Sequence, residues 1–168
     1  DRARDDLGDA TPPDELNRLG PGAEFGWPFC VGAQRPDPQL GATLDICRAT
    51  QPPALTFPPH FGVRGAAFYR GAMFPAEYDG GLFVASHGSE VQLMLQAYKV
   101  LFVPFRAGAP TGEVRDVAAG WMKPDTRLWG RPVDVVVAPD GALLVADEAG
   151  RRVYRLLYAP HATPTPPP

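Results

Sequence analysis

Acidic residues near the start of the chain are the first candidates for metal chemistry. The cluster consists of Asp5, Asp6, Asp9, Asp14 and Glu15. Carboxylate oxygens are the hard ligands that Ca²⁺ prefers, but the spacing of these residues is not that of an EF-hand loop. From the residues alone, a solvated acidic loop is the favoured interpretation, and a calcium site is the alternative.

Two further side chains lie at predicted strand ends and could bind a carboxylate ligand. His87 follows a strongly apolar segment, and Arg131 precedes another. A neutral imidazole can donate a hydrogen bond to an oxygen, and a guanidinium group can pair with a carboxylate through two N–H groups. The alternatives are a turn histidine bonded to its own backbone and a surface arginine paired with Asp125 or Asp134.

The cysteine pair indicates the compartment. Cys30 and Cys47 lie in a Pro- and Gly-rich stretch, and no C-x-x-C pair or nearby Cys/His set offers a zinc site. A disulfide closing a loop of this size would contribute roughly 3 kcal/mol and would indicate an exported protein. Two unrelated buried thiols are the alternative.

Short strands joined by tight turns must position these residues. The apolar runs 133–138 and 142–146 flank the turn signal Asp140-Gly141, and an alternating segment follows at 151–158. The motif recurs upstream at 79–85. A repeat of roughly 60 residues with three or four short strands is typical of a β-propeller blade.

The upstream copy predicts a second blade. Its strands are expected at 65–69, 82–85 and 98–105, with an outer fourth strand at 114–122. The region before Gly62 is less regular. There we expect one irregular turn or a short strand at 14–19, a compact aromatic turn at 26–29 and a Pro-rich excursion at 31–59. At the other end of the chain we expect a mobile Pro/Thr tail at 161–168.

Composition and charge limit the classes of function. The chain has 168 residues, enough for one domain, and its 21 prolines and 18 glycines argue against long helices. A net charge of −3 gives no reason to expect nucleic acid or an anionic membrane as a partner. No apolar run is long enough to span a membrane.

Several strings of residues, taken in order, resemble the glucose/sorbosone dehydrogenase family, and its sorbosone dehydrogenase branch most closely. They are Arg4-Asp5-Asp6-Leu7-Gly8-Asp9, Pro12-Pro13-Asp14-Glu15-Leu16-Asn17, Phe25-Gly26-Trp27-Pro28-Phe29-Cys30, Pro59-His60, Leu82-Phe83-Val84-Ala85-Ser86-His87-Gly88-Ser89, Tyr98-Lys99-Val100 and Gly130-Arg131-Pro132-Val133-Asp134-Val135. Members are soluble six-bladed propellers that use pyrroloquinoline quinone (PQQ). The resemblance implies an all-β partial six-bladed propeller, about three blades of four-stranded antiparallel sheets over residues 1–160, that forms the C-terminal half.

The resemblance also implies a set of site residues. Arg131, His87 and Val133 would contact PQQ, and the Glu15 carboxylate with the backbone carbonyl of Phe25 would bind Ca²⁺. The family's general-base histidine lies upstream of such a segment, so no catalytic residue is expected in this chain. We therefore expect the chain alone to have no turnover.

The activity implied is oxidation of an aldose or sugar aldehyde, with hydride transfer to the quinone and an external electron acceptor. The protein would be periplasmic or secreted. Missing N-terminal blades or a second copy would complete the ring, because propellers close with about four to eight blades.

One departure and two alternatives accompany this interpretation. After Ser89 the family continues with an aromatic and polar loop, whereas residues 90–96 are markedly apolar here. A non-enzymatic binding module, with this loop as a protein-contact patch, is one alternative. A truncated or split gene product without an independent role is the other.

Trp121 and Trp129 are expected in a packed blade edge rather than as a stacking face for the cofactor, and His60 and Trp27 are expected to be structural.

Overall fold

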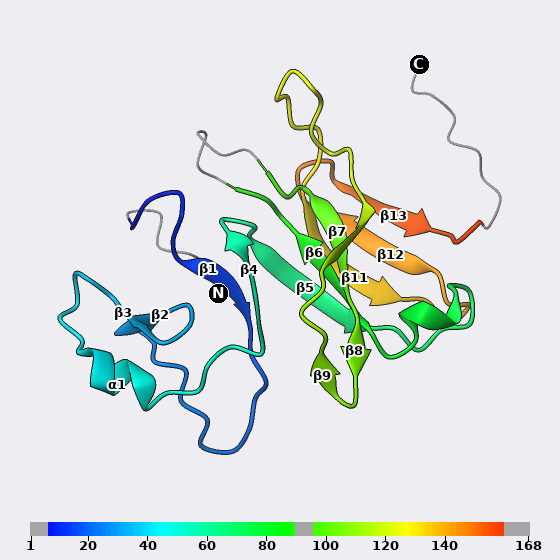
Figure 1. Ribbon diagram of the computed structural model, residues 1–168. Helices are drawn as coiled ribbons and strands as arrows, with labels where there is room; N and C mark the ends of the chain where they lie inside the picture. The colour runs from blue at the N-terminus through cyan, green and yellow to red at the C-terminus, as the bar shows by residue number, and fades with distance from the viewer. Residues whose placement is uncertain (1–6, 90–95, 160–168) are drawn as a thin grey trace.

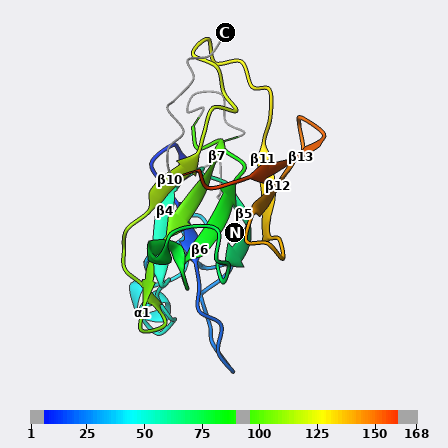
Figure 2. The same ribbon diagram turned by 90° about the vertical axis from the view of Figure 1, so that its right-hand side faces the viewer.

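The structure is a computed structural model, and residues 7–89 and 96–159 are described. Of the five sheets in the described residues, three lie next to one another and are named here in chain order: a first sheet of two strands, a second, central sheet of four and a third sheet of three (Figure 1). The view in Figure 2 shows the third sheet as a layer separate from the central one. The predicted tail at 161–168 and most of the apolar loop 90–96 lie outside the described residues. No helix in the described part of the chain is long and apolar enough to cross a membrane.

The central sheet is a complete four-stranded antiparallel blade. Its strands are β5 (Val63–Phe68), β6 (Leu82–Ser86), β7 (Lys99–Val103) and β10 (Arg115–Ala118), in the spatial order β10-β7-β6-β5. The apolar runs of β6 and β7 are buried because an apolar core covers each face of this sheet. The predicted blade, including its outer fourth strand, is confirmed.

The third sheet is the predicted meander. It consists of β11 (Pro132–Val137), β12 (Leu143–Asp147) and β13 (Arg152–Leu156) in sequential order. β11 packs against β5, and a Cβ atom on Gly65 would overlap Asp134 of β11. The first strands of two successive blades therefore lie side by side, which is the arrangement of strands around a propeller axis.

The first sheet has only two described strands. β1 (Pro13–Leu16) pairs antiparallel with β4 (Leu55–Pro59), which leads directly into β5. The sequence interpretation placed β4 within a Pro-rich excursion and missed it. Pro58 and Pro59 hid the strand, but proline is compatible with an edge strand because it removes only a donor that the sheet does not need there.

The segment between β1 and β4 is held by the predicted disulfide. Cys30 is bonded to Cys47, which joins β2 (Cys30–Val31) to α1 (Leu44–Arg48). The short strand β3 (Arg35–Pro36) pairs with β2, and the Thr43 side chain caps α1 by accepting from the Ile46 N–H. The remaining elements are the 3₁₀ turn η2 (Ala76–Tyr78) and the hairpin strands β8 (Phe105–Arg106) and β9 (Ala109–Pro110).

Two apolar cores lie on opposite faces of the central blade. Phe83 of β6 packs toward the third sheet with Val135 and Leu143, whereas Leu82 and Val84 pack toward the first sheet. This division follows from the two-residue periodicity of a strand. Burying each large apolar side chain contributes about 1.5–3 kcal/mol, so both interfaces between sheets are substantial.

Candidate functional site

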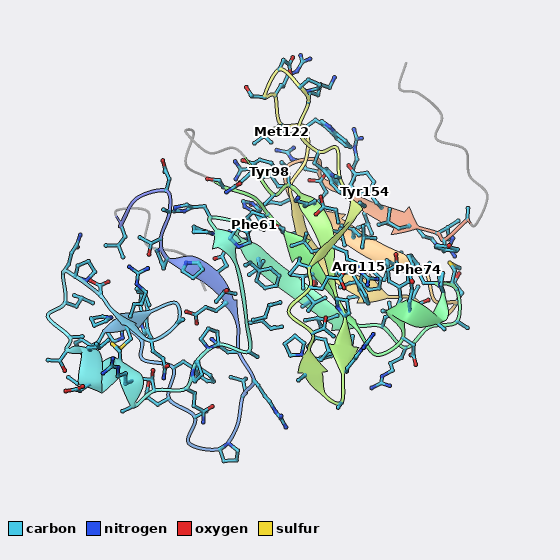
Figure 3. The ribbon with its side chains drawn as sticks, viewed as in Figure 1. Phe61, Phe74, Tyr98, Arg115, Met122 and Tyr154 are labelled. Carbon is cyan, nitrogen blue, oxygen red and sulfur yellow. A yellow bond between two sulfur atoms is a disulfide. The ribbon has the colours of Figure 1, made fainter. Side chains whose placement is uncertain are left out.

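The predicted cofactor residues gather at one end of the second and third sheets. His87 directly follows β6, and Arg131 directly precedes β11. Tyr98, which precedes β7, lies at the same end. In Figure 3, Tyr98 and Met122 lie toward this end, and Phe74 and Arg115 lie toward the other. Antiparallel pairing produces this arrangement, because the end of one strand lies beside the beginning of its neighbour.

His87 is buried and lies in contact with the next blade. Its backbone N–H donates to the Gly62 carbonyl over 3.0 Å. Its ring Nε2 lies 3.2 Å from Oε2 of Glu148, whose own side chain is 65% exposed. Burial lowers the pKa of His87, the positive charges of Arg131 and Arg64 lower it further, and Glu148 opposes them. The imidazole is therefore neutral at pH 7 and has one N–H donor, which Glu148 Oε2 accepts when the proton is on Nε2.

Arg131 is held through its backbone while its guanidinium lies over an aromatic ring. Its N–H donates to Asp147 over 2.7 Å, and its carbonyl accepts from the Glu148 N–H over 3.0 Å. Its guanidinium carbon lies 5.7 Å from the centroid of the Tyr98 ring, within the range of a cation–π contact. Arg131 thus joins the third sheet to the central blade.

Asp147 organises this end of the third sheet, and the sequence interpretation missed it. Its buried carboxylate accepts from the N–H groups of Arg131 and Gly150 and from the Tyr154 hydroxyl. Burial raises the pKa of Asp147, but these three donors outweigh it and hold the pKa below the usual value. The available signal was the repeat itself, because Asp147 ends β12 where Ser86 ends β6.

Val133 lies at an irregular position in β11. The pairing with β12 shifts register between Pro132 and Asp134, so Val133 lies in a β-bulge. Bulges redirect side chains and are common beside functional sites. Val133 is half-buried and two residues from Arg131.

The predicted metal residues are separated from the rest of the acidic cluster. Glu15 is half-buried in β1, and its Oε2 accepts from Asn17 Nδ2 over 3.0 Å. Phe25 is half-buried in the loop that follows. Within residues 7–89 and 96–159, no group of three His, Cys, Asp or Glu side chains is close enough to hold a metal.

Asp14 and Asp9 do not join Glu15. Asp14 is buried and accepts from the Gly62 N–H over 2.7 Å. Burial raises the pKa of Asp14, and the Gly62 N–H only partly opposes this effect. Asp9 is exposed, and Asp5 and Asp6 lie outside the described residues. The five carboxylates therefore do not act as one metal-binding cluster in the part that is described.

One observation nevertheless fits a hard cation beside Glu15. The Oδ1 atom of Asn17 is buried without a hydrogen-bond partner. A carboxylate and an amide oxygen two residues apart, with a backbone carbonyl, are the ligand types of a calcium site. The donor chemistry is therefore suitable, although the set is smaller than the six to eight oxygens that Ca²⁺ takes.

Trp121 lies in the core, whereas Trp129 is 41% exposed. Trp121 is buried, stacks on Trp129 at 6.3 Å and meets Tyr154 edge-on. His60 is also structural: its Nε2 lies 3.0 Å from the Gly8 carbonyl.

The chain resembles a protein known by its sequence and proteins of solved structure. It is 33% identical over 162 residues to an uncharacterised protein of Borreliella burgdorferi, covering 94% of this chain and 42% of that protein. A family AA12 carbohydrate-active enzyme of Trichoderma reesei, in a calcium structure, matches with a TM-score of 0.71 at 19% identity, covering 88% of this chain and 43% of that one. This second match shows the fold alone.

The holo form of the PQQ domain of a pyranose dehydrogenase from Coprinopsis cinerea matches with a TM-score of 0.56 at 26% identity, covering 69% of this chain and 32% of that one. The chain therefore spans less than half the length of each of these proteins. The family model for glucose/sorbosone dehydrogenase matches residues 5–155. With blades of the expected topology and a match over nearly its whole length, the chain belongs to the glucose/sorbosone dehydrogenase family.

Proposed function

We propose that this chain supplies the cofactor-binding C-terminal blades of a PQQ-dependent dehydrogenase of the sorbosone branch, which oxidises an aldose or a sugar aldehyde. The observation that carries the proposal is the convergence of His87 and Arg131, from successive blades, at one end of the sheets. Membership of the family supports the reaction class.

The chemistry of this end of the sheets suits PQQ, which carries three carboxylates. Arg131 and Arg64 both place positive charge near His87, as their lowering of its pKa indicates. A guanidinium can pair with a carboxylate through two N–H groups, and a neutral imidazole can donate to a quinone or carboxylate oxygen. Val133 would offer an apolar contact from the bulge. When bound, the quinone supplies the hydride acceptor.

Calcium belongs to the same proposal. Glu15 and the Phe25 carbonyl would be its ligands, and Asn17 Oδ1 would be a third, because it is a buried oxygen that needs a partner. The remaining ligands would come from water or from parts of the propeller outside this chain.

The rest of the reaction requires groups outside this chain. The general base that takes the proton from the sugar hydroxyl would come from upstream blades, and an external acceptor would reoxidise the cofactor. The disulfide supports an exported, periplasmic or secreted location, because such bonds persist in oxidising compartments. We therefore propose binding, without turnover, for the chain alone.

A thermal melt with ligands tests the proposal. The purified chain would be melted alone, with Ca²⁺, with PQQ and with both, and we expect the midpoint to rise most with both. A ligand present at 100 times its Kd adds about 2.7 kcal/mol to the free energy of unfolding. This increase raises the melting temperature by several degrees. Arg131→Gln should abolish the shift. Arg127→Gln, at an exposed arginine paired with Asp125, is the matched control and should retain it.

The outcomes separate the alternatives. A cooperative melt that neither ligand moves would contradict cofactor binding and favour a binding module. Oxidation of an aldose by the isolated chain with PQQ and Ca²⁺ would contradict the absence of a catalytic base.

A further inference from the structure

Tyr98 lies against both the segment that follows His87 and the side chain of Arg131. It directly precedes β7, at the end of the sheets where the predicted cofactor residues lie (Figure 3). Tyr98 is only 4% exposed. Burial of a tyrosine requires a partner for its hydroxyl group, and the position of that partner restricts where the ring can lie.

The Tyr98 ring is fixed by the backbone that follows His87. Its hydroxyl donates to the Ser89 carbonyl over 2.5 Å. A Cβ atom on Gly88 would overlap the Tyr98 ring, so the ring rests directly on the Gly88 backbone. Gly88 also has a φ of +83°, which residues with a side chain rarely adopt. The close contact between this backbone and the ring therefore depends on glycine.

The same ring contacts the Arg131 guanidinium from the next blade. The guanidinium carbon lies 5.7 Å from the ring centroid, and the Arg131 backbone is held separately by Asp147. A guanidinium that lies on an aromatic face can still pair with a carboxylate through the N–H groups at its rim. Because an arginine side chain loses much rotamer freedom when it is ordered, a conformation arranged in advance lowers the cost of binding a ligand.

We propose that Tyr98 is a positioning residue for the cofactor. Its ring, fixed on Gly88, holds the Arg131 guanidinium in the conformation that pairs with a carboxylate. This inference rests on the proposed cofactor role of Arg131. Without the ring, Arg131 would sample other rotamers, and the Kd for PQQ would rise as the binding-competent fraction falls.

The first measurement tests the contact with no cofactor present. Protons that lie over an aromatic face resonate upfield because of the ring current. The Arg131 side-chain protons should therefore move downfield in Tyr98→Leu and stay in place in Tyr98→Phe. Tyr69→Leu is the matched control, because Tyr69 is also a buried tyrosine whose hydroxyl donates to a backbone carbonyl, that of Gly141. Unchanged Arg131 resonances in Tyr98→Leu would overturn the proposal.

The second measurement is the Kd of the chain for PQQ with Ca²⁺ present, by titration calorimetry. Tyr98→Phe should bind within about threefold of the parent chain, because it keeps the ring. Tyr98→Leu should bind about fivefold to tenfold more weakly, which corresponds to the cost of ordering one long side chain. Tyr69→Leu should bind within about threefold of the parent, because it is remote from Arg131. Parent-like affinity in Tyr98→Leu, or an equal loss in Tyr98→Leu and Tyr69→Leu, would overturn the proposal.

A third measurement separates the electrostatics of the ring from its size, and it applies even if Tyr98→Leu does not fold. Tyr98 is replaced by phenylalanine and by its mono-, di- and trifluorinated derivatives. Fluorine barely changes the volume but weakens the attraction of the ring face for a cation. PQQ affinity should fall stepwise along the series, and equal affinity throughout would overturn the proposal.

Failure of this inference is distinct from failure of the proposed function. If the parent chain binds PQQ and all ring variants bind it equally, only the role of Tyr98 is wrong. If the parent chain does not bind PQQ, the proposed cofactor site is wrong. The Arg131 resonances along the fluorinated series then still decide whether Tyr98 positions Arg131: a stepwise downfield movement supports the positioning, and unchanged resonances overturn it.

Discussion

At the scale of single residues, the candidate site is defined by contacts between equivalent positions of successive blades. Glu148 directly follows β12, as His87 directly follows β6. The two side chains meet across the interface between the blades. Asp147 fixes the backbone of Arg131 from the same motif. The repeat therefore both builds the sheets and brings the chemical groups together.

The charges around His87 should control its protonation. Glu148→Gln removes the negative charge that opposes the shift, so the pKa of His87 should fall further. Arg131→Gln removes a positive charge, so the pKa should rise. NMR titration of the imidazole protons measures both changes.

Glu113→Gln is the control for this titration, because Glu113 pairs with Arg115 on the surface and should leave the His87 titration unchanged. If both His87-neighbour variants moved the pKa in the same direction, the electrostatic account of this site would be wrong.

At the scale of elements, the close contact of β5 with β11 sets the positions of the site residues. Gly65 permits that contact because a Cβ there would overlap Asp134. The requirement is one of space, since Gly65 is not among the residues with a positive φ. The two blades can approach only because one strand lacks a side chain at this position.

Gly65→Ala should therefore destabilise the blade interface. Overpacking of this kind costs about 1–3 kcal/mol, and urea unfolding would measure it. Gly20→Ala is the matched control, because a Cβ at Gly20 would meet no atom within 4 Å and should change the free energy of unfolding by less than about 0.5 kcal/mol. Equal stability of the two variants would contradict the close packing of β5 on β11.

At the scale of the whole molecule, the described chain is an open arc of blades. The central blade has an apolar core on each of its two faces. The first sheet has two described strands and the third has three. A ring of this family therefore depends on polypeptide beyond these blades for closure.

The stability of the whole chain should depend on pH through His87. The folded pKa is lower than the ordinary value of 6.5, so the unfolded state binds more protons as the solution is acidified. The contribution is present above about pH 6.5 and is lost as the pH falls through the folded pKa. Denaturant unfolding at pH 7.5 and 5.5 should show lower stability at 5.5.

His87→Gln should reduce this loss. An unchanged pH dependence in His87→Gln would rule out His87 as its source. Asp147 contributes in the same direction at lower pH, because its folded pKa is also lowered. Asp14 acts in the opposite sense, since its raised pKa favours the folded state at low pH and that benefit is lost as the pH rises through the folded pKa.

The sequence by itself predicted the central blade, the meander of the third sheet and the family resemblance, and it favoured a disulfide over two unrelated thiols. Local signals were enough for these features: apolar runs fix β6 and β12, the turn glycines fix the hairpins, and a motif repeated along the chain fixes the blade. The only described strand of a blade that escaped was β4, because its prolines obscured a pattern that an edge strand tolerates.

Only the tertiary structure decided which polar groups meet. That Glu148 reaches His87 depends on the packing of the third sheet against the central blade. That Asp147 holds Arg131 depends on the register in which β11 pairs with β12, including the shift at Val133, and that Asp14 accepts from Gly62 depends on contact between β1 and the start of the central blade. No local pattern specifies these contacts. The exposure of Phe68, at 52%, is decided in the same way, because it depends on which elements pack against β5.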